Sequence, residues 1–322
     1  MKDIGIVIVT FNSEDYISNC LESILNSDNV NNIGRIIIVD NNSSDNTLSL
    51  IRREFPDVSL ITNETNLGYS KAVNIGMAQL NEKFCLICNP DIELQKHSLN
   101  ILLDLIKSDN SFGVVGGQQV YSNNSWQRSF GNMPGLKDSF YNLFFISTIK
   151  NFSNKIIFNF FKSKRILQSP GYLDGAALVV KNQTFKELNG FNEKYFFYSE
   201  EADFQFRLKR INKKVVYTSE AELMHIRGGS STKIDNKFLF FQDLLVKSKI
   251  LFTSLHRPKS HLLGFIFIEY LHNKKMFYIF SILSFVSFRN KKDLLHKKEL
   301  FSGSSRIWYS YLLKVKSKTL EI

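Results

Sequence analysis

The feature that most constrains the fold is a strand–helix–strand pattern at the start of the chain. Ile4–Val9 and Arg35–Val39 are runs rich in β-branched residues, which predict buried strands. Between them, Ser13–Leu25 places its apolar residues three and four apart, as an amphipathic helix does. This spacing predicts a βαβ unit, in which a helix joins two parallel strands and ligands bind beyond the carboxyl ends of the strands.

Two more segments are expected to extend this sheet. Ser59–Thr62 predicts a short third strand, and Phe84–Leu94 predicts a fourth, buried one. Because parallel strands release their loops at one edge, the polar residues that follow these strands are expected to gather there. These residues are Thr10, Asn12, Asp40, Asp45, Asn89, Asp91 and Glu93.

Two aspartates at this edge have two compatible interpretations. Asp40 ends the second strand and can accept hydrogen bonds from a nucleobase or a ribose. Asp45 closes a segment typical of a turn and can cap the helix predicted at Asn46–Phe55. We therefore assign Asp40 to a ligand and Asp45 to the helix cap.

A glycine-containing loop follows the third strand. The segment Asn66–Gly76 turns into a predicted helix, whose first N–H groups can bind an anion such as a diphosphate, while Gly68 permits close backbone approach. Its spacing matches neither GxGxxG nor GxxxxGK[ST], which excludes a dinucleotide fingerprint and a P-loop. A tight turn with a helix cap is the alternative interpretation.

Acidic residues after the fourth strand indicate a metal site. Asn89, Asp91 and Glu93 are expected at the same edge as the proposed diphosphate. A hard divalent cation that bridges phosphate oxygens requires a carboxylate in such a place. Pro90 fixes the turn and offers a purely structural explanation of the same motif.

A second acidic group follows a block of aromatic residues. Glu200, Glu201 and Asp203 fall within four residues, and Phe204 and Leu208 share one helical face, so the acids are expected to open a helix anchored in the core. The helix dipole favours carboxylates there, and partial burial would raise a pKa toward the range useful for proton abstraction. An acidic first turn balanced by later basic residues is the alternative.

The composition is that of a globular protein. With 322 residues, 43% hydrophobic and 22% charged, the chain is long enough for one large α/β domain or a domain with an appendage. The three cysteines lie in apolar segments, which predicts reduced core residues in a cytoplasmic protein. The N-terminus lacks the pattern of a signal peptide, so we expect a protein that is not exported.

The motifs, taken in order, resemble those of family 2 glycosyltransferases, in particular the rhamnosyltransferase-like branch. They are Val9–Asn12, Val39–Asp45, Asn66–Tyr69, Asn89–Asp91, Asp174–Ala176, Gly190–Phe191 with Glu200–Asp203 after it, and His225–Ser230. The resemblance covers about the first 230 residues. It implies an α/β GT-A fold, a Rossmann-like mixed sheet flanked by helices that binds a nucleotide-diphospho-sugar. It also implies a divalent Mg²⁺ or Mn²⁺ and inversion at the anomeric carbon.

The resemblance assigns donor and metal roles within this chain. Thr10 and Asp40 match the nucleoside-binding positions. Asp91 matches the last aspartate of the metal-binding DxD-type motif, which reads Asn-Pro-Asp here, and His225 matches a position that can help to hold the metal or the diphosphate. The remaining predicted donor-binding residues are Asn12, Asn66, Gly68, Lys71, Asn89 and Arg227.

The resemblance also places the acceptor and the base. Asp174 and Gly175 match the acceptor-side loop, and Glu201 matches the general base that takes the proton of the acceptor hydroxyl. The usual Glu-Asp pair is Glu200-Glu201 here, so the base is one methylene longer. Glu200 and Asp203 are therefore alternative candidates for the catalytic role.

The C-terminal third carries the basic excess. Residues 231–322 contain 17 Lys and Arg against 6 Asp and Glu, which equals the net charge of +11 of the whole chain. The apolar runs Leu262–Leu271 and Met276–Phe288 are shorter than the ~20 residues that span a bilayer. Basic residues flank them, which predicts interfacial helices on an anionic membrane, with a helical cap on the catalytic domain as the alternative. The predicted lipid-facing residues are Phe277, Tyr278, Phe280, Phe285 and Phe288. No nucleic-acid-binding motif accompanies the charge.

The sequence thus predicts two domains, a GT-A domain at residues 1–230 and a basic, aromatic-rich helical region at 231–322. Residues 121–170 carry no assignable motif and are expected either to help select the acceptor or to form a packing subdomain. The expected function is inverting transfer of a sugar to a growing surface polysaccharide, such as an O-antigen, on a lipid carrier at the inner face of the cell membrane. L-Rhamnose from dTDP-rhamnose is the first candidate donor. The alternatives are a galactosyl, glucosyl or N-acetylhexosaminyl transferase that uses a UDP-sugar, and an inactive nucleotide-sugar-binding scaffold.

Overall fold

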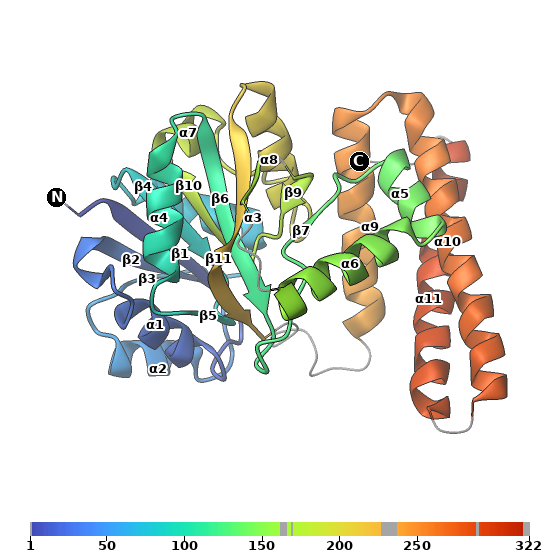
Figure 1. The fold of residues 1–322 in the computed structure, drawn as a ribbon, viewed down its shortest axis with the longest axis horizontal. Coiled ribbons are helices and arrows are strands. Elements are labelled where there is room, and N and C mark those ends of the chain that lie inside the picture. Colours follow the sequence, from blue (N-terminus) through green and yellow to red (C-terminus); the bar gives the residue numbers. More distant parts are fainter. Residues whose placement is uncertain (1, 162–165, 169, 227–236, 288–289, 318–322) are drawn as a thin grey trace. The chain divides into compact units, whose positions relative to one another are not determined.

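The computed structural model describes residues 2–161, 166–168, 170–226, 237–287 and 290–317 (Figure 1). The chain divides into two compact units. The first consists of Met1–Met133 with Ser153–Lys233, and the second of Pro134–Phe152 with Ile234–Ile322.

In its described part, the first unit is built on one mixed sheet of nine strands. Their order is β3-β2-β1-β4-β10-β6-β11-β5, and β8 pairs with β11. The strands are β1 (Ile4–Thr10), β2 (Ile33–Asp40), β3 (Ser59–Thr62), β4 (Phe84–Cys88), β5 (Ile92–Leu94), β6 (Phe112–Val120), β8 (Ile166–Gln168), β10 (Ala177–Lys181) and β11 (Lys214–His225). A separate small pair consists of β7 (Phe130–Gly131) and β9 (Tyr172–Leu173).

The N-terminal half of the sheet confirms the predicted βαβ unit. Strand β1 pairs in parallel with both β2 and β4, and β2 pairs in parallel with β3. Thr10 and Asp40 are register partners at the carboxyl ends of β1 and β2. These two predicted ligands therefore lie side by side.

The prediction of one strand over Phe84–Leu94 is wrong. The chain forms β4 and β5 instead, and Asn89–Asp91 lies between them. Pro90 has no N–H to donate to a ladder, so the strand ends there. Strand β5 then pairs antiparallel with the end of β11, in the register Ile92 to His225. This exchange of partners brings the motif predicted to bind a metal next to His225, which is far away in the chain.

Helices cover both faces of the sheet. They are α1 (Ile17–Leu25), α2 (Thr47–Glu54), α3 (Tyr69–Ala78), α4 (Ser98–Ser108), α7 (Asn182–Glu187) and α8 (Glu200–Arg210), with a 3₁₀ turn at Val30–Asn32. Alternate residues of β1 enter two different cores: Ile6 and Ile8 belong to one, and Val7 and Val9 to the other. A parallel strand that is buried on both faces explains why this segment reads as a continuous apolar run.

The second unit is helical. It contains α5 (Leu136–Leu143), α9 (Lys237–His256), α10 (Lys259–Val286) and α11 (Lys291–Lys316), and α6 (Ile146–Phe161) begins in it. Ser139 Oγ donates a hydrogen bond to Glu269 Oε1 at 2.7 Å, so part of the segment without a motif packs on the C-terminal helices. Among the described residues, none of the helices combines the length and the apolar character needed to cross a bilayer.

The close approach of β6 and β11 generates a prediction about stability. A Cβ atom at Gly117 would lie 2.2 Å from the carbonyl oxygen of Ala221, whereas at Gly116 it would first meet the movable Leu173 Cδ1 at 3.1 Å. We expect Gly117→Ala to lower the free energy of unfolding by about 2–4 kcal/mol and Gly116→Ala by less than about 1.5 kcal/mol. Urea denaturation measures both values, and equal losses would contradict the prediction.

Candidate functional site

The acidic group lies at the first turn of α8, as predicted. The two residues before the helix, Tyr198 and Ser199, have φ angles of 73° and 65°. Non-glycine residues in this left-handed region are strained by about 1 kcal/mol or more each, and such strain is common at functional sites. The resulting sharp turn makes Glu200 and Glu201 the first two residues of the helix.

Glu201 lies directly against the predicted acceptor loop. A Cβ atom at Gly175 would lie 3.2 Å from Glu201 Cβ and 3.3 Å from its Cγ, so only glycine leaves this carboxylate its present position. Burial, and then the negative charge of Asp174, raise the pKa of Glu201 to about 7, although backbone N–H groups and Arg128 oppose the shift. Its Oε2 has no hydrogen-bond partner among the described residues. A carboxylate with a pKa near neutrality suits a general base.

Glu200 has a different environment. Its side chain is buried, and burial followed by the charge of Glu201 raises its pKa well above the ordinary value. Its enclosed side chain is thus less accessible to an acceptor hydroxyl than that of Glu201. The hydroxyl of the nearby Tyr69 is also buried without a partner among the described residues. The backbone N–H of Tyr69 donates a hydrogen bond to the carbonyl of Phe196 at 2.7 Å. This bond joins the glycine-containing loop to the segment that leads into α8.

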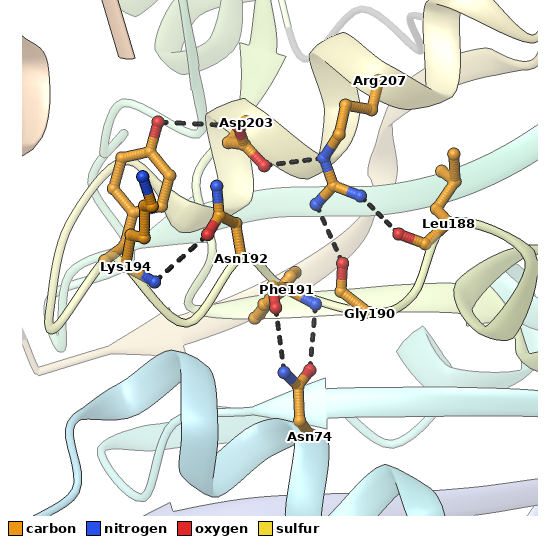
Figure 2. A network of polar contacts seen from close by, with 9 residues as sticks. Asn74, Leu188, Gly190, Phe191, Asn192, Lys194, Asp203 and Arg207 are labelled. Carbon is orange, nitrogen blue, oxygen red and sulfur yellow. Dashed lines mark hydrogen bonds and ion pairs between the residues drawn. The ribbon is translucent and has the colours of Figure 1, made fainter. Parts of the chain in front are cut away.

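Asp203 is engaged in a structural network (Figure 2). Its Oδ2 accepts a hydrogen bond from Arg207 Nε at 2.7 Å, and the side chain is almost fully buried. The same guanidinium donates to the carbonyl oxygens of Leu188 at 2.6 Å and Gly190 at 2.8 Å. The geometry therefore favours Glu201 over Asp203 as the base, because Arg207 neutralises the Asp203 carboxylate.

The same network joins the segment before α8 to helix α3, which follows the predicted diphosphate loop. Asn74 of α3 exchanges two hydrogen bonds with the backbone of Phe191, at 2.8 and 2.9 Å (Figure 2). Gly190 has a φ angle of 67°, and a Cβ atom there would lie 2.4 Å from Asn74 Oδ1. The Gly190–Phe191 motif is thus explained by close packing and by a left-handed backbone.

The predicted metal ligands lie together. Asp91 Oδ1 is 3.5 Å from His225 Nε2, and both side chains are buried. His225 Nδ1 lies 2.9 Å from the amide oxygens of both Gln119 and Gln127. Because these oxygens only accept, a hydrogen on Nδ1 would satisfy them, and Nε2 is the ring nitrogen that faces Asp91. This arrangement, in which the second nitrogen of a histidine is held by an amide, fits a metal-binding imidazole.

Two ligands are few for a structural metal site. Among the described residues no group of three or more His, Cys, Asp or Glu side chains could hold a metal ion. A cation that takes its remaining ligands from water and substrate phosphates needs only one or two protein groups, so Asp91 and His225 suit a substrate-bridging Mg²⁺ or Mn²⁺. Arg227, a predicted diphosphate ligand, lies outside the described residues.

Hydrogen bonds within the protein connect the residues that are predicted to bind the nucleoside. Asp40 is buried, and its carboxylate accepts from Thr10 Oγ1 at 2.7 Å, Ser43 Oγ at 2.6 Å and Ser43 N at 2.8 Å. Asn12 Oδ1 accepts from Ser44 N at 2.8 Å. These bonds hold the loop after β2 against the loop after β1. Asp40 thus shapes the loop, and its contact with a nucleoside stays a prediction.

The predicted diphosphate loop is tied to the same edge. Gly68, with a φ angle of 84°, receives a hydrogen bond at its carbonyl from Asn41 Nδ2 at 3.1 Å, and its N–H donates to Asn66 Oδ1 at 3.0 Å. Lys71 is exposed on the first turn of α3. The N–H of Asn89 donates to the carbonyl of Ala176 at 2.8 Å, which joins the metal motif to the acceptor loop.

Sequence reasoning missed three residues of this site. Gln119 and Gln127 orient His225, and Arg128 influences the charge of Glu201. The N–H of Asp174 also donates to the carbonyl of Ser129 at 3.0 Å, so this short segment connects the metal side to the acceptor side. A usable signal was the pair of glutamines at the end of β6, since polar side chains in a fully buried strand need partners.

Comparison with known proteins agrees with the family that the sequence motifs resemble. The sequence matches the family model for glycosyl transferase family 2 over residues 5–169. It is 27% identical over 219 residues to the N-acetylglucosaminyl-diphospho-decaprenol L-rhamnosyltransferase of Mycobacterium tuberculosis, a match that covers 61% of this chain and 67% of that protein. It is 22% identical over 302 residues to the low-salt glycan biosynthesis hexosyltransferase Agl10 of Haloferax volcanii, covering 87% and 88% of the two chains.

A solved structure shows the likeness of fold. The mannosyltransferase PcManGT from Pyrobaculum calidifontis, determined in complex with GDP-Man and Mn²⁺, has a TM-score of 0.58 and 13% sequence identity to this chain. The match covers 98% of this chain and 86% of that one. It confirms the predicted α/β fold, a mixed GT-A-like sheet flanked by helices and followed by C-terminal helices.

The network around Arg207 generates a prediction. Arg207→Met removes three donated hydrogen bonds and leaves the Asp203 carboxylate buried beside an apolar side chain, so we expect a loss of about 3–5 kcal/mol in the free energy of unfolding. Arg210→Met, at an exposed position of the same helix, should change it by less than about 0.5 kcal/mol. Adding Asp203→Asn to Arg207→Met should recover part of the loss. Urea denaturation of the four proteins tests this, and similar stabilities for the two arginine variants would overturn it.

Proposed function

This chain belongs to glycosyl transferase family 2, and we propose that it moves L-rhamnose from a dTDP-linked donor to a lipid-linked precursor of a cell-surface polysaccharide. The catalytic part of this proposal rests on one observation, a continuous set of contacts in the first unit. Asp91 faces His225, His225 is held by Gln127, the neighbouring Ser129 binds Asp174, and Gly175 abuts Glu201. A metal-binding pair and a base with a pKa near 7 thus share one framework.

The choice of rhamnose rests on the relative from Mycobacterium tuberculosis. Its name specifies an L-rhamnosyl donor and an acceptor sugar on a diphospho-decaprenol lipid. The motifs of this chain resemble the same branch of the family, which supports the same class of donor and acceptor. A UDP-linked hexose is the alternative donor, and binding of a panel of nucleotide sugars to the purified protein distinguishes the two. An inactive scaffold is disfavoured, because it has no need for a buried carboxylate with a raised pKa.

The chemistry assigned to Glu201 is general-base catalysis. Its carboxylate takes the proton of the acceptor hydroxyl while that oxygen forms a bond to C1 of the sugar. The bond from C1 to the diphosphate oxygen breaks, and the nucleoside diphosphate leaves with the electron pair. Because the base and the leaving group lie on opposite faces of C1, the anomeric configuration inverts. Asp174 and Gly175 would position the acceptor beside the base.

The donor would occupy the carboxyl edge of the sheet. Thr10 and Asp40 would border the nucleoside, and the N-terminal turn of α3 with Gly68 and Lys71 would border the diphosphate. Asp91 and His225 would hold the divalent cation, which when bound neutralises charge on the leaving diphosphate. An imidazole ligand beside a carboxylate favours Mn²⁺ over Mg²⁺, because Mg²⁺ prefers ligands that are all oxygen.

The proposed acceptor places the enzyme at a membrane. A lipid-linked glycan is reached from the cytoplasmic face, so we propose that the protein associates peripherally with the inner face of the cell membrane. The net charge of +11 that the C-terminal third carries supports attraction to anionic lipids.

The role of Glu201 generates a test of activity. Glu201→Gln keeps the shape of the side chain but not its basicity, so we expect the turnover number to fall by about 10²–10⁴-fold with little change in donor affinity. Glu200→Gln should retain more activity, because the Glu200 side chain is buried and Glu201 is the carboxylate that lies against Gly175. Transfer assays with dTDP-rhamnose and isothermal titration measure both properties. Loss in Glu200→Gln without loss in Glu201→Gln would transfer the role to Glu200.

The pKa of about 7 also sets the pH profile. A general base must be deprotonated, so the rate should be constant above pH 7 and should fall about tenfold for each pH unit below it. The acid limb should disappear in Glu201→Gln. An acid limb that the variant keeps would show that another group titrates.

The metal pair generates a second test. Chelation with EDTA should stop transfer, and Asp91→Asn should weaken Mn²⁺ binding by about 10–100-fold because the charged ligand is lost. Gln127→Leu should also weaken it, by a smaller factor, because His225 loses an orienting partner. Titration calorimetry with Mn²⁺ measures affinity directly. Full activity in EDTA would show that a protein cation such as Lys71 neutralises the diphosphate instead.

A further inference from the structure

Helix α10 in the second unit is apolar on two opposite faces. One face lies in the core of the unit, where Phe265 and Ile266 are buried and the Phe265 ring packs edge-on against Trp308 with centroids 5.5 Å apart. The charged residue within this buried side is neutralised, since Glu269 accepts a hydrogen bond from Ser139 and lies 3.9 Å from Lys249 Nζ. Packing inside the unit therefore accounts for one face of α10 only.

The other face is exposed along the length of the helix. Its residues recur at intervals of three, four, seven and eight, which places them on one side of an α-helix. They are Leu263, Phe267, Leu271, Tyr278, Ile282, Phe285 and Val286. Exposure rises toward the end of the helix, to 65% for Ile282, 89% for Phe285 and 68% for Val286. An exposed set of large apolar residues of this kind on a folded unit indicates a binding surface.

Basic residues lie on this face and just beyond its apolar end. Between positions 274 and 299 the sequence has seven Lys and Arg against two Asp and Glu. Lys274 lies on the exposed face itself, and Lys291 and Lys292 are exposed at the start of α11, just beyond the apolar end of α10. An apolar stripe bordered by cations is complementary to a surface that is apolar inside and anionic outside.

We propose that the exposed face of α10, from Leu263 to Val286, lies in the boundary between headgroups and acyl chains of an anionic lipid bilayer. The helix would lie along the membrane surface, with Phe285 and Val286 inserted most deeply. This inference rests on the peripheral membrane association proposed above and deepens it by naming the surface that binds lipid, whatever the identity of donor or acceptor. A second copy of the chain is disfavoured as the occupant, because two copies would place their basic borders against each other.

The structure narrows the set of aromatic residues proposed to contact lipid. Of the five residues in the prediction, Tyr278 and Phe285 are exposed, whereas Phe277 and Phe280 are partly exposed and pack toward α11. The Phe280 ring stacks on Phe301 with centroids 5.5 Å apart, and Lys298 Nζ lies 5.6 Å from the centroid of Phe277. These two rings pack toward α11 because they lie on the opposite side of the helix. Phe288 lies outside the described residues.

One flanking lysine has a structural role as well. Lys275 Nζ donates to the carbonyl of Leu143 and lies 3.7 Å from the centroid of the Phe145 ring, and burial lowers its pKa. Replacing it would disturb the packing of α5 on α10. A test of lipid binding should therefore use the exposed lysines and leave Lys275 in place.

Flotation of the full-length protein with vesicles tests the proposal. The vesicles are phosphatidylcholine with or without phosphatidylglycerol, and no substrate is present. The double variant Phe285→Ser/Val286→Ser should bind mixed vesicles at least about tenfold more weakly than the wild type. Its folding should be unaffected, because both side chains are largely exposed, and circular dichroism checks this. Lys291→Gln/Lys292→Gln should lose about fivefold per lysine on the anionic vesicles and little on neutral ones.

The matched control removes two exposed leucines from the other helices of the same unit. Leu255→Ser/Leu313→Ser, on α9 and α11, should float like the wild type. Equal losses in the control and in Phe285→Ser/Val286→Ser would overturn the assignment to this face. The proposal would also be overturned if the wild type failed to bind vesicles and instead formed a dimer that the Phe285→Ser/Val286→Ser variant does not form. Analytical ultracentrifugation detects the dimer. Transfer to a soluble acceptor analogue, measured in parallel, separates failure of this proposal from failure of the proposed function.

Discussion

The site depends on the pairing of β5 with the end of β11. Strand β4 ends at Cys88, just before Pro90. The chain then forms the short strand β5, which pairs with β11, the last strand along the chain. This pairing sets Asp91 beside His225, and the N–H of Ile226 closes it by donating to the carbonyl of Asp91 at 3.0 Å. Backbone hydrogen bonds between distant segments thus fix the distance between the two side chains that are proposed to hold a metal ion.

The acidic turn of α8 shows how neighbouring carboxylates acquire different properties. Arg207 pairs with Asp203 and also donates a hydrogen bond to the carbonyl of Leu188, so it holds the segment before the helix in place. Burial and the charge of Glu201 raise the pKa of Glu200 well above its ordinary value, whereas Glu201, at the predicted acceptor loop, has a pKa of about 7. The helix N-terminus and Arg128 oppose the cost of burying its charge, so the pKa rises into the useful range without the acid becoming permanently neutral.

The second unit divides the faces of α10 between two kinds of contact. Aromatic packing against α11 buries one side, and the opposite side leaves large apolar residues in water. That exposure is unfavourable in water, and lipid contact would relieve it. A catalytic unit held at the membrane in this way would work where a lipid-linked acceptor is most concentrated.

The sequence by itself determined the elements whose signal is local. The βαβ start and the acids at the opening of α8 follow from periodicity and from turn chemistry, and the order of short motifs indicated the family. Tertiary structure alone decided which partner each group has: His225 with Gln119 and Gln127, Arg207 with the carbonyls of Leu188 and Gly190, and β5 with β11. It also decided that Phe280 of α10 packs inward while Phe285 is exposed. The physical reason is that periodicity reports which side chains share a face, whereas the neighbour that covers that face comes from a part of the chain that local pattern does not encode.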